Sequence, residues 1–436
     1  MWTRGVLGTN MPPDSLPIES AGMTDITANS TRRDIKVIAL VAAAHGCSHF
    51  YQLVLPPLFP FITASLGIGF EQAGLLIACF YAASGLAQTP SGFLVDRFGA
   101  RRVLLSGLSL AAASVTLMSL MPSFWVAIPL VVLAGLGNSV FHPADYSILS
   151  HSVSKSRMAR AYGVHTLSGN IGWAAAPVTV LALASLLGWR GALAVAGIAG
   201  LAIVLFLASQ SGVLASGRAR RGLGPAPPQT LSAGTLALLA SPPILLCFAY
   251  FVLLSVSLTG NQTFMPAALN QLYGTPMGIA GAALSAYLLA GSLGVLAGGV
   301  AADRSTRQEG IVAVGLLAAA AIMLVVGFVR LADPAVVAVM ALAGFASGST
   351  TPSRDMLVRA ATPAGATGKV FGFVYSGLDL GAAVTPPVLG LFLDRGAPRM
   401  VFVLSAVALA LTIATAFRVG KSRALRVPRA EPAPAE

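Results

Sequence analysis

The 436-residue sequence predicts an all-α membrane protein with twelve transmembrane helices, arranged as two six-helix bundles related by a pseudo-twofold axis. Three observations support this fold class. Hydrophobic residues make up 56% of the chain and charged residues only 10%, whereas a soluble domain is about 25% charged. Many apolar runs reach the ~20 residues that a helix needs to cross a bilayer. Groups of residues also recur in the same order in both halves of the chain.

The apolar runs are interpreted as helices because lipid offers no partner for open backbone groups. The runs are long and unbroken, without the ~10-residue alternating segments typical of barrel strands. The predicted helices cover residues 36–62, 72–93, 102–120, 124–148, 159–186, 190–210, 241–265, 278–301, 310–330, 335–357, 369–392 and 399–418.

Polar segments divide the chain into five parts. Residues 1–34 contain prolines and no apolar core, so we interpret them as a disordered cytoplasmic tail rather than a signal peptide. Residues 35–210 form the predicted N-terminal six-helix bundle, and residues 236–418 form the C-terminal one. Between them, residues 211–235 are basic and proline-containing, which predicts a cytoplasmic linker. Residues 419–436 are predicted to be a second disordered cytoplasmic tail.

Lysine and arginine residues predict the orientation, because loops rich in them stay in the cytoplasm. The cytoplasmic side is assigned Arg32, Arg33, Lys36, Arg97, Arg101, Arg102, Lys155, Arg157, Arg160, Arg218, Arg220, Arg221, Arg304, Arg307, Arg359, Lys369 and the basic C-terminal residues. The other side carries only Arg190, Arg330, Arg395 and Arg399. We therefore expect a multi-pass protein of the cytoplasmic (inner) membrane with both termini in the cytoplasm. These loops account for the net charge of +12, and no nucleic-acid partner is expected.

The two halves of the chain repeat in register. Gly135, Pro143, Arg160, Gly163, Gly172, Pro177 and Arg190 correspond, without a gap, to Gly344, Pro352, Lys369, Gly372, Gly381, Pro386 and Arg399. Parallel repeats of this kind place a substrate site at their interface near the membrane midplane, and one half rocks against the other.

One loop carries a family signature: Ser91-Gly92-Phe-Leu-Val-Asp96-Arg97-Phe-Gly99-Ala-Arg101-Arg102. It resembles the loop between helices two and three of the major facilitator superfamily, and Asp303-Arg304 with Arg307 resembles its degenerate second copy. The resemblance covers all twelve helices and implies the major facilitator fold. It also implies that the loop is a gate latch. Gly92 is then expected to permit close helix approach and Gly99 a tight turn. Asp96 is expected to lie at a helix N-terminus of the other half, and Arg97, Arg101 and Arg102 to anchor to the cytoplasmic surface.

Two further motifs resemble the fosmidomycin-resistance type of drug exporter. They are Gly137-Asn-Ser-Val-Phe-His142-Pro143 on helix four and Gly169-Asn170-Ile-Gly172, with Pro177, on helix five. This resemblance favours export. The chain departs from the superfamily's proton-antiporter pattern at Val131, where many members have arginine, and at Ala176, where glycine is usual.

Asp379 lies near the middle of predicted helix eleven, whereas nearly all other acids lie in tails or loops. A charge at that depth costs about 2.5–3.5 kcal/mol on insertion scales. Desolvation favours the neutral carboxylic acid, which suits Asp379 to take up and release a proton. The alternative is a neutral or hydrogen-bonded aspartate in a helix contact. The equivalent residue in the first half is Asn170.

Polar side chains follow the faces of helices one, four and five. His45, His49 and Gln52 share one face of helix one, and Asn138, His142 and Asp145 share one face of helix four, with His165 on helix five. In this superfamily helices one and four line the cavity. Histidine there can bind an anion or relay protons, or it can simply pack between helices. No ligand spacing demands a metal, so none is expected. Further candidate lining residues are Tyr162, Trp173, Asn261 and Tyr375.

Asp145 and Arg354 occupy equivalent places in the repeat, near the cytoplasmic ends of helices four and ten, and carry opposite charges. One hypothesis is that they form an ion pair across the pseudo-twofold axis when the cytoplasmic gate is closed. The alternative is that Arg354 pairs locally or faces the cytoplasm.

These observations predict a secondary active transporter that moves a small solute across the membrane by alternating access, in proton-coupled efflux of a drug-like or anionic compound. Proton-coupled uptake of a small organic anion is the alternative. An intramembrane enzyme or a non-transporting sensor is the alternative from a different class. No nucleotide-binding loop is present, so an ion gradient is the expected energy source. The expected partners are a solute, protons and lipid. We expect a functional monomer without a cofactor and without enzymatic activity.

Overall fold

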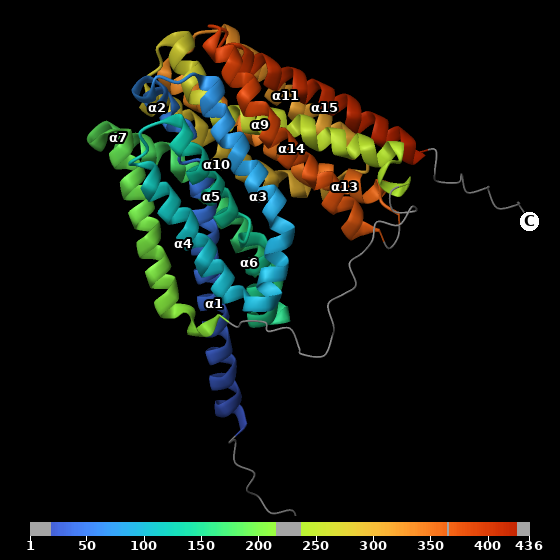
Figure 1. Ribbon diagram of the computed structural model, residues 1–436. Helices are drawn as coiled ribbons and strands as arrows, with labels where there is room; N and C mark the ends of the chain where they lie inside the picture. Colours follow the sequence, from blue (N-terminus) through green and yellow to red (C-terminus); the bar gives the residue numbers. More distant parts are fainter. Residues whose placement is uncertain (1–18, 215–236, 364–365, 425–436) are drawn as a thin grey trace, which may run out of the picture.

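The computed structural model describes residues 19–214, 237–363 and 366–424, and all regular structure in these ranges is helical (Figure 1). The first half contains α1 (Glu19–Gln52), η1 (Pro56–Leu58), α2 (Phe59–Leu66), α3 (Phe70–Phe98), α4 (Ala100–Met118), α5 (Phe124–Asn138), α6 (Phe141–Ser152), η2 (Lys155–Arg157), α7 (Met158–Gln210) and η3 (Ser211–Val213). The second half contains α9 (Pro242–Tyr273), α10 (Met277–Arg304), α11 (Gln308–Phe328), α12 (Asp333–Gly348), α13 (Thr351–Ala361), α14 (Thr367–Asp394) and α15 (Met400–Ala424).

The number of membrane crossings agrees with the predicted fold class. The described residues contain 11 helical segments long and apolar enough to cross a membrane. One of them, Lys155–Val213, has 59 residues and is interrupted at Gly188, whose φ of 70° and ψ of 168° are not helical. A positive φ is accessible to glycine without steric cost. Counting this segment as two crossings gives the twelve predicted helices, and the predicted all-α fold class is confirmed.

Three of the predicted helices are not continuous in the structure. The prediction 36–62 is broken after Gln52, because the following segment contains Pro56, Pro57 and Pro60, which cannot continue a hydrogen-bonded helix. The predictions 124–148 and 335–357 are each broken before a short helix, α6 or α13. Each short helix has a proline near its start, Pro143 or Pro352, so one backbone donor is missing in both. Because these prolines correspond in the repeat, the two halves break at equivalent points.

Both predicted disordered tails are partly helical in the described residues. Helix α1 begins at Glu19, so residues 19–34 belong to it. Asp34 joins the end of this segment to the rest of the first half. Its carboxylate accepts hydrogen bonds from Ser154 Oγ at 2.7 Å and Arg157 Nη1 at 2.9 Å. Helix α15 continues to Ala424, beyond the predicted start of the second tail at residue 419. Residues 1–18, the linker residues 215–236 and residues 425–436 lie outside the described residues.

A repeated arginine contact supports the internal symmetry. Arg190 donates hydrogen bonds from Nη1 to the carbonyl oxygens of Ser119 at 3.1 Å and Met121 at 2.8 Å, just beyond the C-terminus of α4. Its repeat partner Arg399 donates from Nε to the Gly327 carbonyl at 2.9 Å, at the C-terminus of α11. A cation at this place satisfies the terminal carbonyls and the negative end of the helix dipole. The two halves therefore use the same device to join neighbouring helices.

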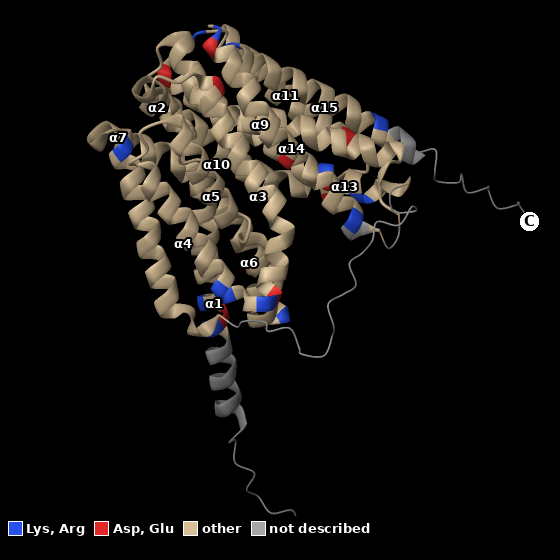
Figure 2. Cartoon of the chain, viewed as in Figure 1, with Lys and Arg blue, Asp and Glu red and all other residues tan. Residues whose placement is uncertain are grey.

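The two halves contact each other through α3 with α14 and through α7 with α10. Two of these approaches need glycine: a Cβ at Gly74 would overlap the Pro386 carbonyl, and one at Gly390 would overlap the Phe70 carbonyl. We call the end that carries the signature loop the basic end. Figure 1 shows the halves meeting at the other end and diverging toward the basic end. Figure 2 shows that Lys and Arg lie mainly at the helix ends, while the middles of the helices are almost free of charge.

A carboxylate joins the halves at the end where they meet. Asp394, at the end of α14, accepts hydrogen bonds from the backbone N–H groups of Phe70 at 2.7 Å and Glu71 at 2.9 Å, at the start of α3. The N-cap residue of α3 is Gly69, which has no side chain for this purpose. Asp394 therefore caps a helix of the other half, and this contact exists only while the two ends are together.

We expect Asp394→Ala to shift the protein away from this arrangement of the halves. The lost capping interaction contributes about 1–2 kcal/mol at an exposed site, or roughly a 5- to 30-fold change in the population ratio. Electron spin resonance distances between labels at Ser156 and Thr306, both exposed at the basic end, measure this shift. Asp333→Ala, at the start of α12, is the matched control and should leave the distances unchanged. An unaltered distance distribution in Asp394→Ala would contradict the latch role.

Candidate functional site

A buried histidine–aspartate cluster lies in the first half, at the junction of α1, α6 and α7. The Asp145 side chain is 0% exposed, and its Oδ2 lies 3.2 Å from His45 Nδ1 and 3.1 Å from His165 Nε2. The rings of His45 and His165 stack with centroids 3.6 Å apart. A Cβ at Gly169 would lie 3.0 Å from His45 Nε2, so glycine leaves room for the rings. The predicted association of these polar residues from three helices is therefore present.

A separate network of hydrogen bonds follows α1 beyond this cluster. Asn138 Oδ1 accepts from Ser48 Oγ at 2.7 Å and from Gln52 Nε2 at 3.2 Å, and Asn138 Nδ2 donates to Ser84 Oγ at 2.9 Å. The Gln52 amide in turn accepts from Trp173 Nε1 at 2.9 Å. The predicted polar faces of helices one and four therefore lie against each other and are largely satisfied.

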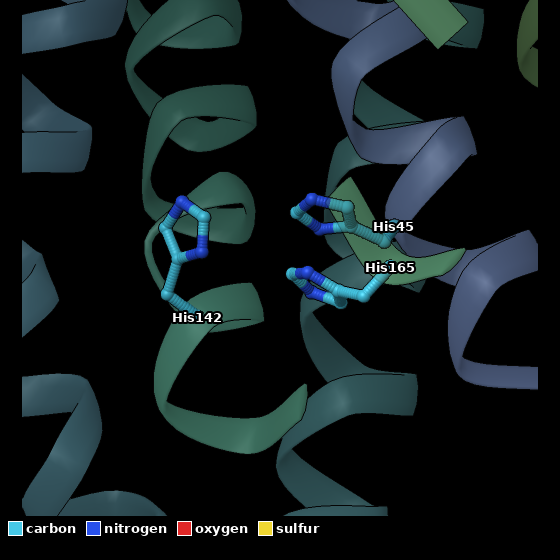
Figure 3. A group of neighbouring side chains, drawn as sticks. All are labelled: His45, His142 and His165. Atoms are coloured by element: carbon cyan, nitrogen blue, oxygen red, sulfur yellow. The ribbon is translucent and has the colours of Figure 1, made fainter. Parts of the chain in front are cut away.

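Two further histidines border the cluster. His49 lies between His45 and Trp173, with ring centroids 4.4 Å and 4.3 Å away, and its buried Nδ1 has no hydrogen-bond partner in the described residues. His142 is exposed, and its ring centroid lies 5.5 Å from that of His45. It faces the stacked rings of His45 and His165 (Figure 3).

Arg354 forms the corresponding charged site of the second half, on α13. Its Nε donates to Asp355 Oδ1 at 2.9 Å, and its Nη2 donates to the Tyr375 hydroxyl at 3.3 Å. The guanidinium carbon lies 4.6 Å from the ring centre of Phe251, within cation–π range. Within the described part of the chain Nη1 has no partner, so the guanidinium keeps donors for an anion.

Asp145 and Arg354 are each paired within their own half in this structure. In this state, in which the halves diverge at the basic end, Arg354 therefore forms a local ion pair, as the alternative hypothesis expected. The ion pair across the pseudo-twofold axis stays a prediction for the state in which that end is closed.

Asp379 lies on α14 at the contact between the halves. A Cβ at Gly85 of α3 would lie 3.8 Å from the Asp379 Cβ and Cγ. The Asp379 side chain is exposed and makes no hydrogen bond or ion pair to any described residue. Its repeat partner Asn170 is half-buried on α7. The acid thus faces the other half of the protein rather than packing inside its own bundle.

The other predicted lining residues divide into two groups. Tyr162 is 37% exposed, and Tyr375 contacts Arg354 as described. Asn261, in contrast, is fully buried on α9 and donates to Met323 Sδ at 3.6 Å, so it packs inside the second half. In this state its side chain is enclosed within the second half, and its expected role as a lining residue stays a prediction.

The signature loop agrees with expectation in part. Gly99 has a φ of 87° between α3 and α4, a turn that favours glycine. A Cβ at Gly92 would meet nothing within 4 Å, so the close approach expected there is absent. Its repeat partner Gly299 is equally free, because the halves diverge at this end. Asp96 lines a cavity of about 320 Å³ with Pro143 and Ser147.

The charged residues of the loop and its copy lie near the molecular surface. Asp96, Arg97, Arg102, Asp303, Arg304 and Arg307 are exposed, and Arg101 is half-buried. Neither Asp96 nor Asp303 has an ion-pair partner in the described ranges. The latch contacts expected of Asp96 stay a prediction for the closed state.

Several residues of these sites were not predicted from the sequence. Asp355 is the immediate partner of Arg354, and the adjacent opposite charges were an available signal. Ser48 and Ser84 complete the Asn138 network, but isolated serines in apolar helices carry no distinctive pattern. Three histidines, His45, His142 and His165, bring one nitrogen each within 4.8 Å of one another, which no linear spacing announces.

Two repeated six-helix halves with polar clusters inside apolar bundles define a membrane transport protein. Residues 41–278 and 252–436 match the family described as the Major Facilitator Superfamily, and the chain belongs to it. A bacterial homologue of the human lysosomal transporter Spinster, crystallised in an inward-facing and occupied conformation, has the same fold. Its TM-score is 0.76 at 15% identity, covering 88% of this chain and 96% of that one.

The curated relatives align with differing shares of this chain. The probable L-galactonate transporter of Escherichia coli (strain K12) is 27% identical over 33% of this chain and 32% of its own. The membrane sensor protein UhpC of the same organism is 25% identical over 74% of this chain and 78% of its own. The chain aligns with less than half of the length of the first curated relatives it matches.

Proposed function

We propose that this chain is a proton-coupled secondary transporter of a small organic anion in the cytoplasmic membrane, working by alternating access. The observation that carries the proposal is the position of Asp379, an unpaired carboxyl on α14 that faces Gly85 of the other half. Rocking of the halves changes the surroundings of such a group in every cycle. Its proton affinity then differs between the two states, which is what coupling requires.

An anionic solute is supported by Arg354. Its guanidinium is held by Asp355, Tyr375 and the ring of Phe251, and it keeps free donors. Arginine with an open fork suits carboxylate or phosphate groups. The name of the L-galactonate transporter also refers to a sugar acid, which is an anion of this class.

We propose export as the direction, because the motifs around His142 and Asn170 resemble those of the fosmidomycin-resistance exporters. With the basic end toward the cytoplasm, the arrangement described above is the inward-facing state, ready to receive a cytoplasmic solute. Uptake by symport uses the same residues with the opposite relation between solute and proton movement.

Reconstitution in liposomes with an internal pH dye tests the function. The solute panel contains sugar acids, sugar phosphates, fosmidomycin and a neutral sugar as the matched negative. Solute-dependent proton flux with an anion supports the proposal, and the sign of the dye response separates antiport from symport. Solute movement without proton flux contradicts coupling. Binding of a solute without its transport would favour a sensor, the role named for UhpC.

Arg354→Gln is expected to raise the KM for the anion about tenfold, because one charge-assisted contact of about 1.4 kcal/mol is lost. Arg354→Lys should retain part of the affinity, since the charge stays but the planar fork is lost. Arg359→Gln, on an exposed position of the same helix, is the control. Equal KM values in Arg354→Gln and Arg359→Gln would exclude Arg354 from solute binding.

A further inference from the structure

We propose that His45, His142 and His165 form a binding site for a divalent transition-metal ion of the zinc class. One nitrogen from each of the three side chains lies within 4.8 Å of the others. Figure 3 shows the two stacked rings, from α1 and α7, facing the ring of His142 on α6. Three helices of the same half thus bring three imidazoles to one point.

The distances suit a site that closes on its ion. Zinc–nitrogen bonds of about 2.0–2.1 Å place the ligand atoms of a tetrahedral site roughly 3.3 Å apart. The present separation of up to 4.8 Å therefore needs a movement of about 1.5 Å, shared among the side chains. His142 can supply most of it, because its side chain is exposed whereas those of His45 and His165 are buried. It also lies beside the helix break before α6, which provides local backbone adjustment.

The aspartate behind the histidines has the position of an orienting partner. Asp145 Oδ2 contacts a nitrogen of both His45 and His165, and a carboxylate that accepts from metal-binding histidines fixes their tautomer and orientation. Its other oxygen, Oδ1, is buried without any hydrogen-bond partner in the described residues. Unsatisfied buried polar atoms are costly, and the charge of a bound cation would offset that cost.

The donor set selects the class of ion. Three imidazoles with a carboxylate behind them favour zinc, cobalt, nickel or copper over magnesium and calcium, which prefer oxygen ligands. The fourth position of a three-histidine site stays open to water or a solute anion. The site uses none of the residues on which proton coupling rests, so the two proposals are independent.

Metal binding to the purified full-length chain tests the site without any transport assay. After chelation, the protein is titrated with Co²⁺, whose visible absorption reports tetrahedral coordination, and Zn²⁺ is then used as competitor. We expect one saturable Co²⁺ site per chain, displaced by Zn²⁺, and a rise in the thermal unfolding midpoint with Zn²⁺. Absence of saturable binding, or octahedral Co²⁺ spectra alone, overturns the proposal.

Variants locate the ion. His142→Ala is expected to weaken Co²⁺ binding on the order of 100-fold, and Asp145→Asn about 10- to 100-fold, as for other orienting partners. His151→Ala is the matched control, because this fifth histidine lies on the same helix and bonds the Ser147 carbonyl outside the cluster. We expect the metal-free unfolding midpoint of His142→Ala to match that of the wild type, because the side chain is exposed. Equal affinities in His142→Ala and His151→Ala would place the ion elsewhere and refute the site.

Discussion

Asp379→Asn is expected to abolish solute-driven proton flux while the protein still folds and binds solute. Asparagine has nearly the same shape as aspartic acid but carries no exchangeable acidic proton. The native side chain makes no hydrogen bond or ion pair to any described residue, so the substitution breaks no visible contact. Proton flux in liposomes and solute binding in detergent, measured on the same preparation, check both parts.

Two controls make this result specific to the position. Asp333→Asn applies the same chemical change at the start of α12, away from the contact between the halves, and should leave proton flux unchanged. Asp379→Glu keeps the acid and should retain part of the flux. Wild-type proton flux in Asp379→Asn would show that another group carries the proton, or that transport is not coupled to protons.

Gly298→Ala is expected to destabilise the protein strongly, although it adds a single methyl group. A Cβ at Gly298 of α10 would overlap the backbone carbonyl of Ser349, beside the break before α13. A backbone atom cannot rotate away as a side chain can, so the helices must separate. Overpacking of this kind costs about 1–3 kcal/mol. The measurement is the thermal unfolding midpoint in detergent together with the yield of monodisperse protein.

The neighbouring glycine supplies the matched control. A Cβ at Gly299 would meet nothing within 4 Å, so Gly299→Ala should be neutral or slightly stabilising, because alanine has the higher helix propensity. The two substitutions differ only by one position on the same helix. Equal unfolding midpoints for both variants would show that α10 and the region around Ser349 pack less closely than described.

Much of the fold could be read from local signals in the sequence. The apolar runs predicted the crossings, and the recurrence of Pro143 as Pro352 predicted two halves of one design. The interruptions next to these prolines were missed, because hydropathy averages over a window and ignores a single missing N–H. The start of α1 at Glu19 was not predicted, because polar residues give no hydropathy signal, although Asp34 is bonded to Ser154 and Arg157.

The candidate sites were predicted less completely than the fold. Helical spacing grouped His45, His49 and Gln52 on α1, since residues three or four apart share a face. The same spacing failed for Asn138 and Asp145, because the break between α5 and α6 separates them. Spacing within one helix says nothing about which face meets which neighbour. It therefore did not show that Asp145 contacts both His45 and His165, or that Asn261 contacts Met323 of α11.

By itself the sequence determined that this chain spans a membrane about twelve times in two similar halves, because transfer of each residue into lipid depends mainly on its own side chain. Only the tertiary structure decided which polar groups meet. Those meetings depend on close approach between helices, which glycines such as Gly169 and Gly298 permit at particular points. Steric fit between distant segments is a property of the packed bundle, so it has no signature in any short stretch of sequence.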